Sequence, residues 1–456
     1  MKWISWIIVT ILSSASATAQ TDSSGFSSPR SQPFFNGPDV QHARIESGSI
    51  ALDFSEINKL LSARTGNRIK LPSLDGFTGN QAEPLELERV DLFAPGARVR
   101  VVSENETILI EPRLRHFFMA NNSSMAIGLA VDPETGITSG YAIKGGGELE
   151  ITGKLSSSLK FAELSPPDSG SKECATALED QPAENIAFLD DGIPDSMSAA
   201  GTGSTLDFEA VVAIDTDTEW LDGFDNDTTA ASDWIQDLFL AMNVMFERDV
   251  ATRLLLGDVF LRLGPDPYTN TSGYRPEQLY EFGEYWRVNQ GGIDRSFAAM
   301  LSGRNIGAGS FSGIAWLNLF CENGWVSGGR TIGSYSYNAI GNRWTANSAA
   351  KFIGHELGHN MGSPHTHCYN PPVDECYGGE GGCFSGPASC PASGAGTTMS
   401  YCHLTGGCRS TPDFHPTVQA LLGDRLAANS PACISPFTDP EPDPDPELPL
   451  FQSGFE

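Results

Sequence analysis

The segment from His355 to His365 holds the residue types and spacing of a metal site, with the pattern H-E-x-x-H-x-x-G-x-x-H. Two histidines four positions apart lie on one face of a helix and can bind one metal ion together. Gly362 ends that helix, because glycine adopts left-handed conformations that a β-carbon disfavours. The chain then turns and brings His365 to the same ion. Three imidazoles leave one position of a tetrahedral zinc open for water, and Glu356 is placed to take a proton from that water.

The clustering of histidines favours this interpretation over ordinary surface or core positions. Four of the chain's eight histidines fall between residues 355 and 367, and three of them have ligand spacing with a glycine between. His367 and His403 lack that spacing. Both could support the ligands from behind, but we expect surface positions for them.

Composition and charge limit the class of protein. The chain has 456 residues, which predicts two folded units plus tails, and its hydrophobic content of 40% is sufficient for real cores. It carries 57 acidic and 28 basic residues, for a formal charge of −29. This charge makes nucleic acid and anionic membranes poor partners, and solubility is its simplest explanation.

The beginning of the chain and its cysteines predict export. Residues 1–19 have a positive start, a short apolar run and a small-residue cleavage site, as in a secretory signal peptide. No later stretch approaches membrane-spanning length, so we expect a secreted, extracellular protein. Nine cysteines fit an oxidising compartment. Eight of them lie between residues 321 and 433 and can pair into four disulfides of open connectivity, whereas Cys174 stands alone.

The chain divides into five parts by composition. After the signal peptide, residues 20–162 show short alternating runs such as Arg98–Val102 and Thr107–Ile110, which predict a mainly β pro-domain. Residues 163–206 are rich in Pro, Gly and Ser and suit a flexible connector that proteases can reach. A catalytic unit is expected at 207–436. Residues 437–456 form an acidic, Pro-rich spacer and a C-terminal tail.

The pattern in the catalytic unit alternates strands with helices. The expected elements are strands at Phe208–Ile214, Leu254–Leu263 and Gly313–Leu317, and helices at Ala230–Arg248, Gln278–Asn289, Asp294–Leu301 and Val418–Ala428. Asn347 or Ser348 is expected to cap the helix that carries the metal motif. On that helix Ile353 and Leu357 lie opposite the histidines and can pack into the core.

A run of aspartates precedes the first long helix. It could bind Ca²⁺, but its spacing is not that of a calcium loop, and a solvated turn fits it better. The run consists of Asp215, Asp217, Asp222, Asp225 and Asp227.

The extended motif resembles that of the metzincin metallopeptidases, and Thr398-Met399-Ser400-Tyr401 resembles the methionine turn beneath their zinc. The sequence around both motifs is most similar to the adamalysin/reprolysin branch. The resemblance implies an α+β catalytic domain with a mixed sheet and an active-site helix. It also implies that Met399 forms an apolar floor under the ligands. That branch usually has aspartate directly after the third histidine, where this chain has Thr366.

The resemblance suggests three further roles. Some metzincin branches place a tyrosine two residues after the turn methionine, where it binds zinc or the oxyanion, so Tyr401 is a candidate for that role. The segment containing Gly313, Ile314, Ala315 and Trp316 precedes the motif helix as the edge strand does in metzincins, where an extended peptide pairs with it. Cys174 could bind the zinc at its open position and silence the precursor, as in adamalysin-like and matrixin-like precursors. The alternative for Cys174 is a disulfide to one of the other eight.

Together these features predict a secreted zinc endopeptidase made as a zymogen and acting on extended polypeptides, as a monomer. The cofactor is zinc. The competing hypothesis is a non-catalytic secreted binding or adhesion module on a metallopeptidase fold. Such descendants commonly lose the glutamate or a histidine of the motif, and here all of them are present.

Overall fold

The computed structural model describes residues 48–74, 85–164, 172–176, 206–270, 275–304, 311–340 and 344–439. All of them belong to one compact unit, Ile45–Glu456. The predicted signal peptide, most of the predicted connector and residues 440–456 of the tail lie outside the described residues. Within the described part, no helix has the length and apolar character needed to cross a membrane.

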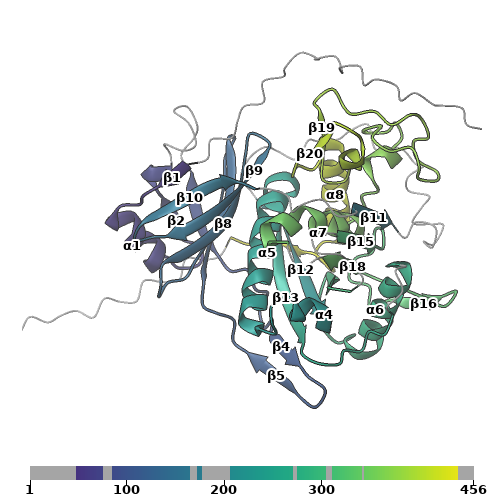
Figure 1. Cartoon of the computed structure of the whole chain (residues 1–456), viewed down its shortest axis with the longest axis horizontal. Coiled ribbons are helices and arrows are strands. Elements are labelled where there is room, and N and C mark those ends of the chain that lie inside the picture. The colour runs from purple at the N-terminus through teal and green to yellow at the C-terminus, as the bar shows by residue number, and fades with distance from the viewer. Residues whose placement is uncertain are drawn as a thin grey trace, which may run out of the picture. The chain divides into compact units, whose positions relative to one another are not determined.

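The first sheet is built from the N-terminal half of the chain, and its neighbouring strands all run antiparallel (Figure 1). Its strand order is β1-β10-β9-β8-β7-β6-β3-β2. Helix α1 (Phe54–Ser62) accompanies it and begins with a capping box between Asp53 and Glu56. The strands are β1 Gly48–Ile50, β2 Arg68–Lys70, β3 Glu86–Val90, β6 His116–Asn121, β7 Met125–Val131, β8 Ile137–Lys144, β9 Gly147–Lys154 and β10 Ser158–Glu163.

The second sheet is mixed and has the order β11-β15-β18-β14-β12-β13-β4-β5, with β21 pairing to β12. Strands β12, β13, β14 and β18 pair in parallel, whereas β15 runs antiparallel to β18. The strands are β4 Val99–Val102, β5 Thr107–Ile110, β11 Lys172–Thr176, β12 Phe208–Thr216, β13 Thr252–Arg262, β14 Phe297–Ser302, β15 Phe311–Ala315, β18 Tyr335–Ile340 and β21 Ser435–Pro436.

Two strands of the predicted pro-domain lie in this second sheet. β4 pairs in parallel with β13, and β5 pairs with β4. The prediction that both segments form strands is therefore confirmed. These two strands, however, are hydrogen-bonded into the second sheet, which also contains β15 and β18, the strands that precede the metal motif.

The helices of the second half are α4 Thr218–Asp222, α5 Thr228–Val250, α6 Arg275–Asn289, α7 Ala346–Asn360 and α8 Pro416–Asn429. Short elements complete it: β16 Trp325–Ser327, β17 Arg330–Ile332, η2 Thr366–Cys368, β19 Ala395–Gly396, η3 Cys402–Leu404 and β20 Arg409–Ser410. Beyond α7 the chain is mostly loop, and disulfides Cys368–Cys383, Cys376–Cys402 and Cys390–Cys408 cross-link it. The fourth disulfide, Cys321–Cys433, joins it to the rest of the unit.

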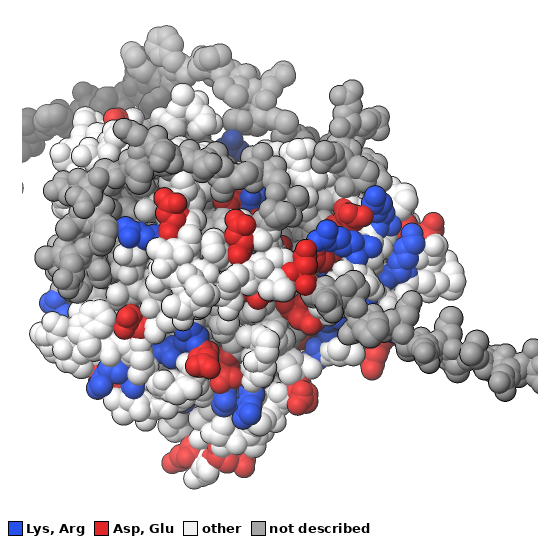
Figure 2. All heavy atoms as spheres, turned by 180° about the vertical axis from the view of Figure 1, so that it is seen from behind, with Lys and Arg blue, Asp and Glu red and all other residues white. Residues whose placement is uncertain are grey.

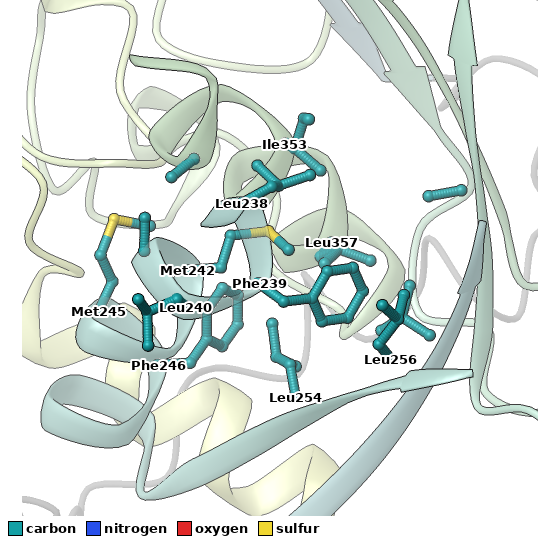
Figure 3. Close-up of a cluster of buried hydrophobic side chains, with 14 of the residues drawn as sticks. Leu238, Phe239, Leu240, Met242, Met245, Phe246, Leu254, Leu256, Ile353 and Leu357 are labelled. Carbon is teal, nitrogen blue, oxygen red and sulfur yellow. The ribbon is translucent and has the colours of Figure 1, made fainter. Parts of the chain in front are cut away.

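Helices α5 and α7 share a buried apolar cluster with strand β13, drawn in Figure 3. Ile353 and Leu357 of α7 are fully buried in it, as predicted from their spacing. Burying one such side chain contributes about 1.5–3 kcal/mol, so this face fixes the rotation of α7 about its axis. The residues labelled in Figure 3 are Leu238, Phe239, Leu240, Met242, Met245, Phe246, Leu254, Leu256, Ile353 and Leu357.

Two local predictions are wrong. The segment Asp294–Leu301 was expected to be helical, but Phe297–Ser302 is the central strand β14, with parallel neighbours on both sides. All six of its residues are buried, and a short continuous apolar run does not distinguish a buried strand from a helix. The cap of α7 is Thr345, whose side chain accepts a hydrogen bond from the Ser348 backbone, rather than Asn347 or Ser348.

Charged side chains are mixed on the face shown in Figure 2, where basic groups lie beside acidic ones. Two exposed ion pairs of the described residues are Arg68–Glu88 at 3.2 Å and Lys70–Glu86 at 3.6 Å. At exposed positions such pairs contribute little to stability, but they place basic groups among the many acidic side chains of this protein.

Candidate metal centre

Helix α7 positions the first two candidate ligands and the glutamate. His355, Glu356 and His359 are all at most 6% exposed, because the opposite face of the helix is fixed in the core. The helix ends at Asn360, whose amide donates to the carbonyl oxygens of Trp316 and Tyr335 at 2.8 and 3.0 Å. This contact ties the end of α7 to the sheet. Gly362 then takes a positive φ of 108°, which turns the chain as the sequence predicted.

The three motif histidines come together. Their metal-binding atoms lie within 4.8 Å of one another. Nε2 of His359 and Nε2 of His365 are 3.2 Å apart. Two nitrogens bound at about 2.0–2.1 Å to one tetrahedral zinc would be about 3.3 Å apart, so the spacing fits shared coordination.

The other ring nitrogen of each histidine identifies the tautomer. Nδ1 of His355 lies 2.6 Å from the Thr398 carbonyl oxygen, and Nδ1 of His359 lies 2.7 Å from the Ser363 carbonyl oxygen. Nδ1 of His365 lies 2.7 Å from Oε2 of Glu380. All three acceptors lack a proton to donate, so each Nδ1 is the donor.

It follows that each neutral ring presents an unprotonated Nε2 to the same point. Within the described residues, Nε2 of His355 is buried with no hydrogen-bond partner. Three lone pairs that face one another in a buried site repel each other unless a cation lies between them. The residues present therefore fit a zinc ion.

Burial keeps these rings neutral, which is the state that binds metal. Burial, followed by the charge of neighbouring His365, lowers the pKa of His355 to about 3. Burial and the two neighbouring histidines lower the pKa of His359 well below its usual value. Burial also lowers the pKa of His365, but the hydrogen bond from Nδ1 to Glu380 and the negative charge of Glu380 oppose that shift.

Comparison with known proteins identifies the domain. Residues 209–411 match the family model described as metallo-peptidase family M12, of the reprolysin type. This segment is an M12 metallopeptidase domain. The resemblance drawn from the two motifs is thereby confirmed.

The other comparisons add little to that identification. A solved structure that matches is metalloproteinase-II from Bacteroides fragilis, with 11% identity, a TM-score of 0.29, and coverage of 63% of this chain and 79% of that one. This likeness is too weak to support an argument about the present chain. No curated protein sequence matches it significantly.

In the M12 domain, Glu356 lies directly under the predicted edge strand. A β-carbon built on Gly313 of β15 would come within 2.3 Å of Oε1 of Glu356 and 2.7 Å of Phe352. Only glycine fits there, so the backbone of β15 passes close over the carboxylate. Ile314 and Ala315 continue the strand. Trp316, which was expected to belong to it, lies beyond its end, with its backbone N–H and C=O bonded to Tyr335 and Asn360.

The predicted edge of β15 is paired rather than open. Strand β11 runs parallel to β15, with Cys174 opposite Gly313. A strand at Lys172–Thr176 was not expected, because this stretch was assigned to the flexible connector. The other eight cysteines pair among themselves, so the alternative disulfide of Cys174 has no partner among them.

The methionine-turn residues pack against the centre. Met399 is fully buried, and its sulfur would be 2.6 Å from a β-carbon built on Gly358 of α7. The preceding carbonyl, of Thr398, is the acceptor for His355. The Tyr401 ring lies 4.1 Å from the His365 ring, centroid to centroid. Tyr401 therefore packs against the ring of the third candidate ligand.

Two side chains near the centre were missed or misjudged. His367 was expected at the surface, but it is fully buried, and its Nε2 lies 2.9 Å from Oε2 of Glu380. Glu380 lies outside both motifs, so neither motif predicts its role. The only signal in the sequence is its position between Cys368 and Cys383, whose pairing brings the loop back to His365. His403 is half-buried.

The acidic run is not a solvated turn at its start. Asp215 and Asp217 are fully buried: Asp215 pairs with Arg262 at 2.7 Å, and Asp217 caps α4 by accepting from the Trp220 backbone. Asp227 caps α5. Within the described residues, the groups close enough to hold a cation consist of His, Cys and Glu380 and include none of these aspartates.

Proposed function

We propose that this protein is a secreted, zinc-dependent endopeptidase of the metzincin kind, made as a zymogen. The observation that supports it most is the convergence of three neutral imidazoles through unprotonated Nε2 atoms, two of them on the helix that also carries Glu356. His355, His359 and His365 would hold the zinc. When bound, zinc polarises the scissile carbonyl and lowers the pKa of a water molecule.

The chain's own residues would supply the remaining steps. Glu356 accepts a proton from the attacking water and then passes it to the nitrogen of the leaving amine. The backbone of β15 would align an extended polypeptide over Glu356 by strand addition, through Gly313, Ile314 and Ala315. Met399 supports the ligands from below, and Tyr401 is a candidate to stabilise the oxyanion.

The position of β11 supports a zymogen. This strand occupies the edge of β15 that a substrate would need, and its register sets Cys174 opposite Gly313, the residue against Glu356. In our proposal the thiolate of Cys174 would be a further ligand of the zinc and would keep the precursor silent until the connector is cut. Replacing Cys174 with Ala should give a precursor with premature activity or self-digestion. A silent Cys174→Ala precursor would argue against this latch.

Export is proposed from the predicted signal peptide at residues 1–19. The four disulfides are compatible with an oxidising compartment. We further propose that the protein acts as a monomer. The described residues give no support to calcium binding.

The test is Glu356→Ala in the full chain, after both the wild type and the variant are activated by the same external protease, which is then inhibited. Loss of a general acid–base residue costs about 10²–10⁴-fold, so casein cleavage should fall by at least about 10² with zinc content unchanged. Addition of o-phenanthroline should abolish the wild-type activity. Turnover by Glu356→Ala equal to that of the wild type would refute the peptidase. Inactivity of both proteins would favour the alternative of a non-catalytic binding module.

A further inference from the structure

One carboxylate oxygen connects the third candidate ligand to a second buried histidine. Oε2 of Glu380 accepts a hydrogen bond from Nδ1 of His365 at 2.7 Å and lies 2.9 Å from Nε2 of His367. The two rings are nearly parallel, with an interplanar angle of 6° and centroids 5.3 Å apart. A single carboxylate oxygen thus contacts both rings. The other ring nitrogen of His365, Nε2, lies 3.2 Å from Nε2 of His359.

The loop that carries Glu380 is fixed at several points. The Cys368–Cys383 disulfide closes it across a sequence separation of 15. The backbone N–H of Phe384 donates to the His367 carbonyl oxygen at 2.9 Å, and that of Cys383 donates to the Glu380 carbonyl oxygen at 3.3 Å. The carboxylate therefore reaches His365 from a constrained backbone.

The acceptor of His365 differs in charge from those of the other two ligands. His355 and His359 donate to neutral backbone carbonyls, whereas His365 donates to a carboxylate. A hydrogen bond to a charged acceptor is roughly twice as strong as a neutral one, and it makes the imidazole a better metal ligand.

We propose that Glu380 is a positioning residue for the zinc site. It fixes the tautomer and orientation of His365 and raises the basicity of Nε2, and His367 in turn orients the carboxylate. This inference rests on the proposed zinc peptidase. Loss of such a partner typically costs 10–100-fold in metal affinity.

The same atoms could instead hold a second metal ion, since His365, His367, Cys368 and Glu380 have ligand atoms close together. Two observations argue against it. Cys368 is bonded to Cys383, so it provides no thiolate. Both ring nitrogens also lie at hydrogen-bond distance from a single carboxylate oxygen, which leaves no room between them for an ion.

The experiment uses the full chain and measures zinc affinity by competition with a chromophoric chelator. Glu380→Gln keeps the shape of the side chain but removes its charge, and it should bind zinc about 10–100-fold more weakly than the wild type. Glu375→Gln is the matched control, because it removes the same charge from an exposed residue of the same loop region. Its zinc affinity should be unchanged. At saturating zinc, Glu380→Gln should recover most of its activity.

Three results would overturn the proposal. The first is a zinc affinity of Glu380→Gln within twofold of that of Glu375→Gln. The second is a fall in affinity matched by an equal fall in the free energy of unfolding of the metal-free protein, which would make Glu380 merely structural. The third is two zinc ions in the wild type and one in Glu380→Gln, which would make it a ligand. Failure of the peptidase itself would appear separately, as a wild type that binds no zinc.

Discussion

The two histidines on helix α7 and the third on the loop after it reach the same point by different means. His355 and His359 are four residues apart on one rigid helix, and their Nδ1 atoms donate to backbone carbonyls. His365 lies beyond the turn at Gly362, in a loop region that disulfides cross-link, and it depends on a side chain from residue 380.

The positions of the three histidines therefore have two kinds of cause, one local in the sequence and one long-range. Helical periodicity alone sets the spacing of His355 and His359, whereas contacts between distant residues set the position of His365. We therefore expect changes in the loop to weaken the centre by degrees, and loss of a helix ligand to abolish it.

The largest effect is expected for His359→Ala. The variant loses a proposed zinc ligand and leaves the buried Ser363 carbonyl oxygen without the donor that His359 provides. Zinc should be absent from the purified protein by elemental analysis, and casein cleavage should fall to background. Full zinc occupancy in this variant would mean that the helix pair is not the core of the centre.

The variant Gly313→Ala tests whether the position of Glu356, on helix α7, depends on a residue that is distant in the sequence. The new methyl group would meet the Glu356 carboxylate, so that carboxylate must move. A displacement of about 1 Å at a reacting group costs about 10²-fold, and we expect that fall in kcat/KM with zinc content unchanged. The control is Gly292→Ala, because a β-carbon there meets nothing within 4 Å. Equal activity of the two variants would contradict the proposed proximity.

Removing the loop disulfide should weaken the third ligand specifically. In Cys368→Ser/Cys383→Ser we expect zinc affinity to fall about tenfold, the lower end of the effect of losing an ordered partner. The control is Cys321→Ser/Cys433→Ser, which opens a longer loop, with a sequence separation of 112 instead of 15. It should cost more free energy of unfolding, about 5 against about 3 kcal/mol, but less zinc affinity. If the loss of zinc affinity is proportional to the loss of unfolding free energy in both variants, the proposal that this loop positions the third ligand is wrong.

The smallest effect concerns pH in the metal-free protein. The pKa of His355 is lowered to about 3, and those of His359 and His365 are also lowered. A depressed folded-state pKa gives stability that is present above about pH 6.5 and lost as pH falls towards the folded value. Below pH 6.5 each histidine should cost up to about 1.4 kcal/mol per pH unit.

Urea unfolding at pH 7.5, 6.5 and 5.5, with chelator present, measures this dependence. The variant His355→Gln removes one titrating group and should therefore have a shallower slope than the wild type. Identical slopes in the two proteins would show that this ring does not resist protonation.

Sequence predicted the parts of the site that follow from local spacing. The helix with His355, Glu356 and His359 needed only a 3.6-residue period, and the turn at Gly362 needed only the freedom of glycine. Glu380 could not be predicted, because its contact with His365 depends on a disulfide whose connectivity the sequence leaves open. The burial of Asp215 was missed for a similar reason: its partner, Arg262, lies on the neighbouring strand β13.

The helices and strands divide in the same way, into elements that local periodicity predicts and elements that depend on distant partners. The strands β12, β13 and β15 and the helices α5, α6 and α8 lie where the periodicity predicted them. The strand β14 was mistaken for a helix because only its two parallel neighbours, far away in the sequence, make it a strand. The strand β11 was missed because its partner is β15, more than a hundred residues later.

The most direct test of the central claim is a crystal structure of the zinc-loaded protein with anomalous data collected at the zinc edge. The account predicts one zinc ion per chain, bound by Nε2 of His355, His359 and His365 at about 2.0–2.1 Å. An ion located instead between His367 and Glu380, or a correctly folded chain that takes up no zinc, would contradict it.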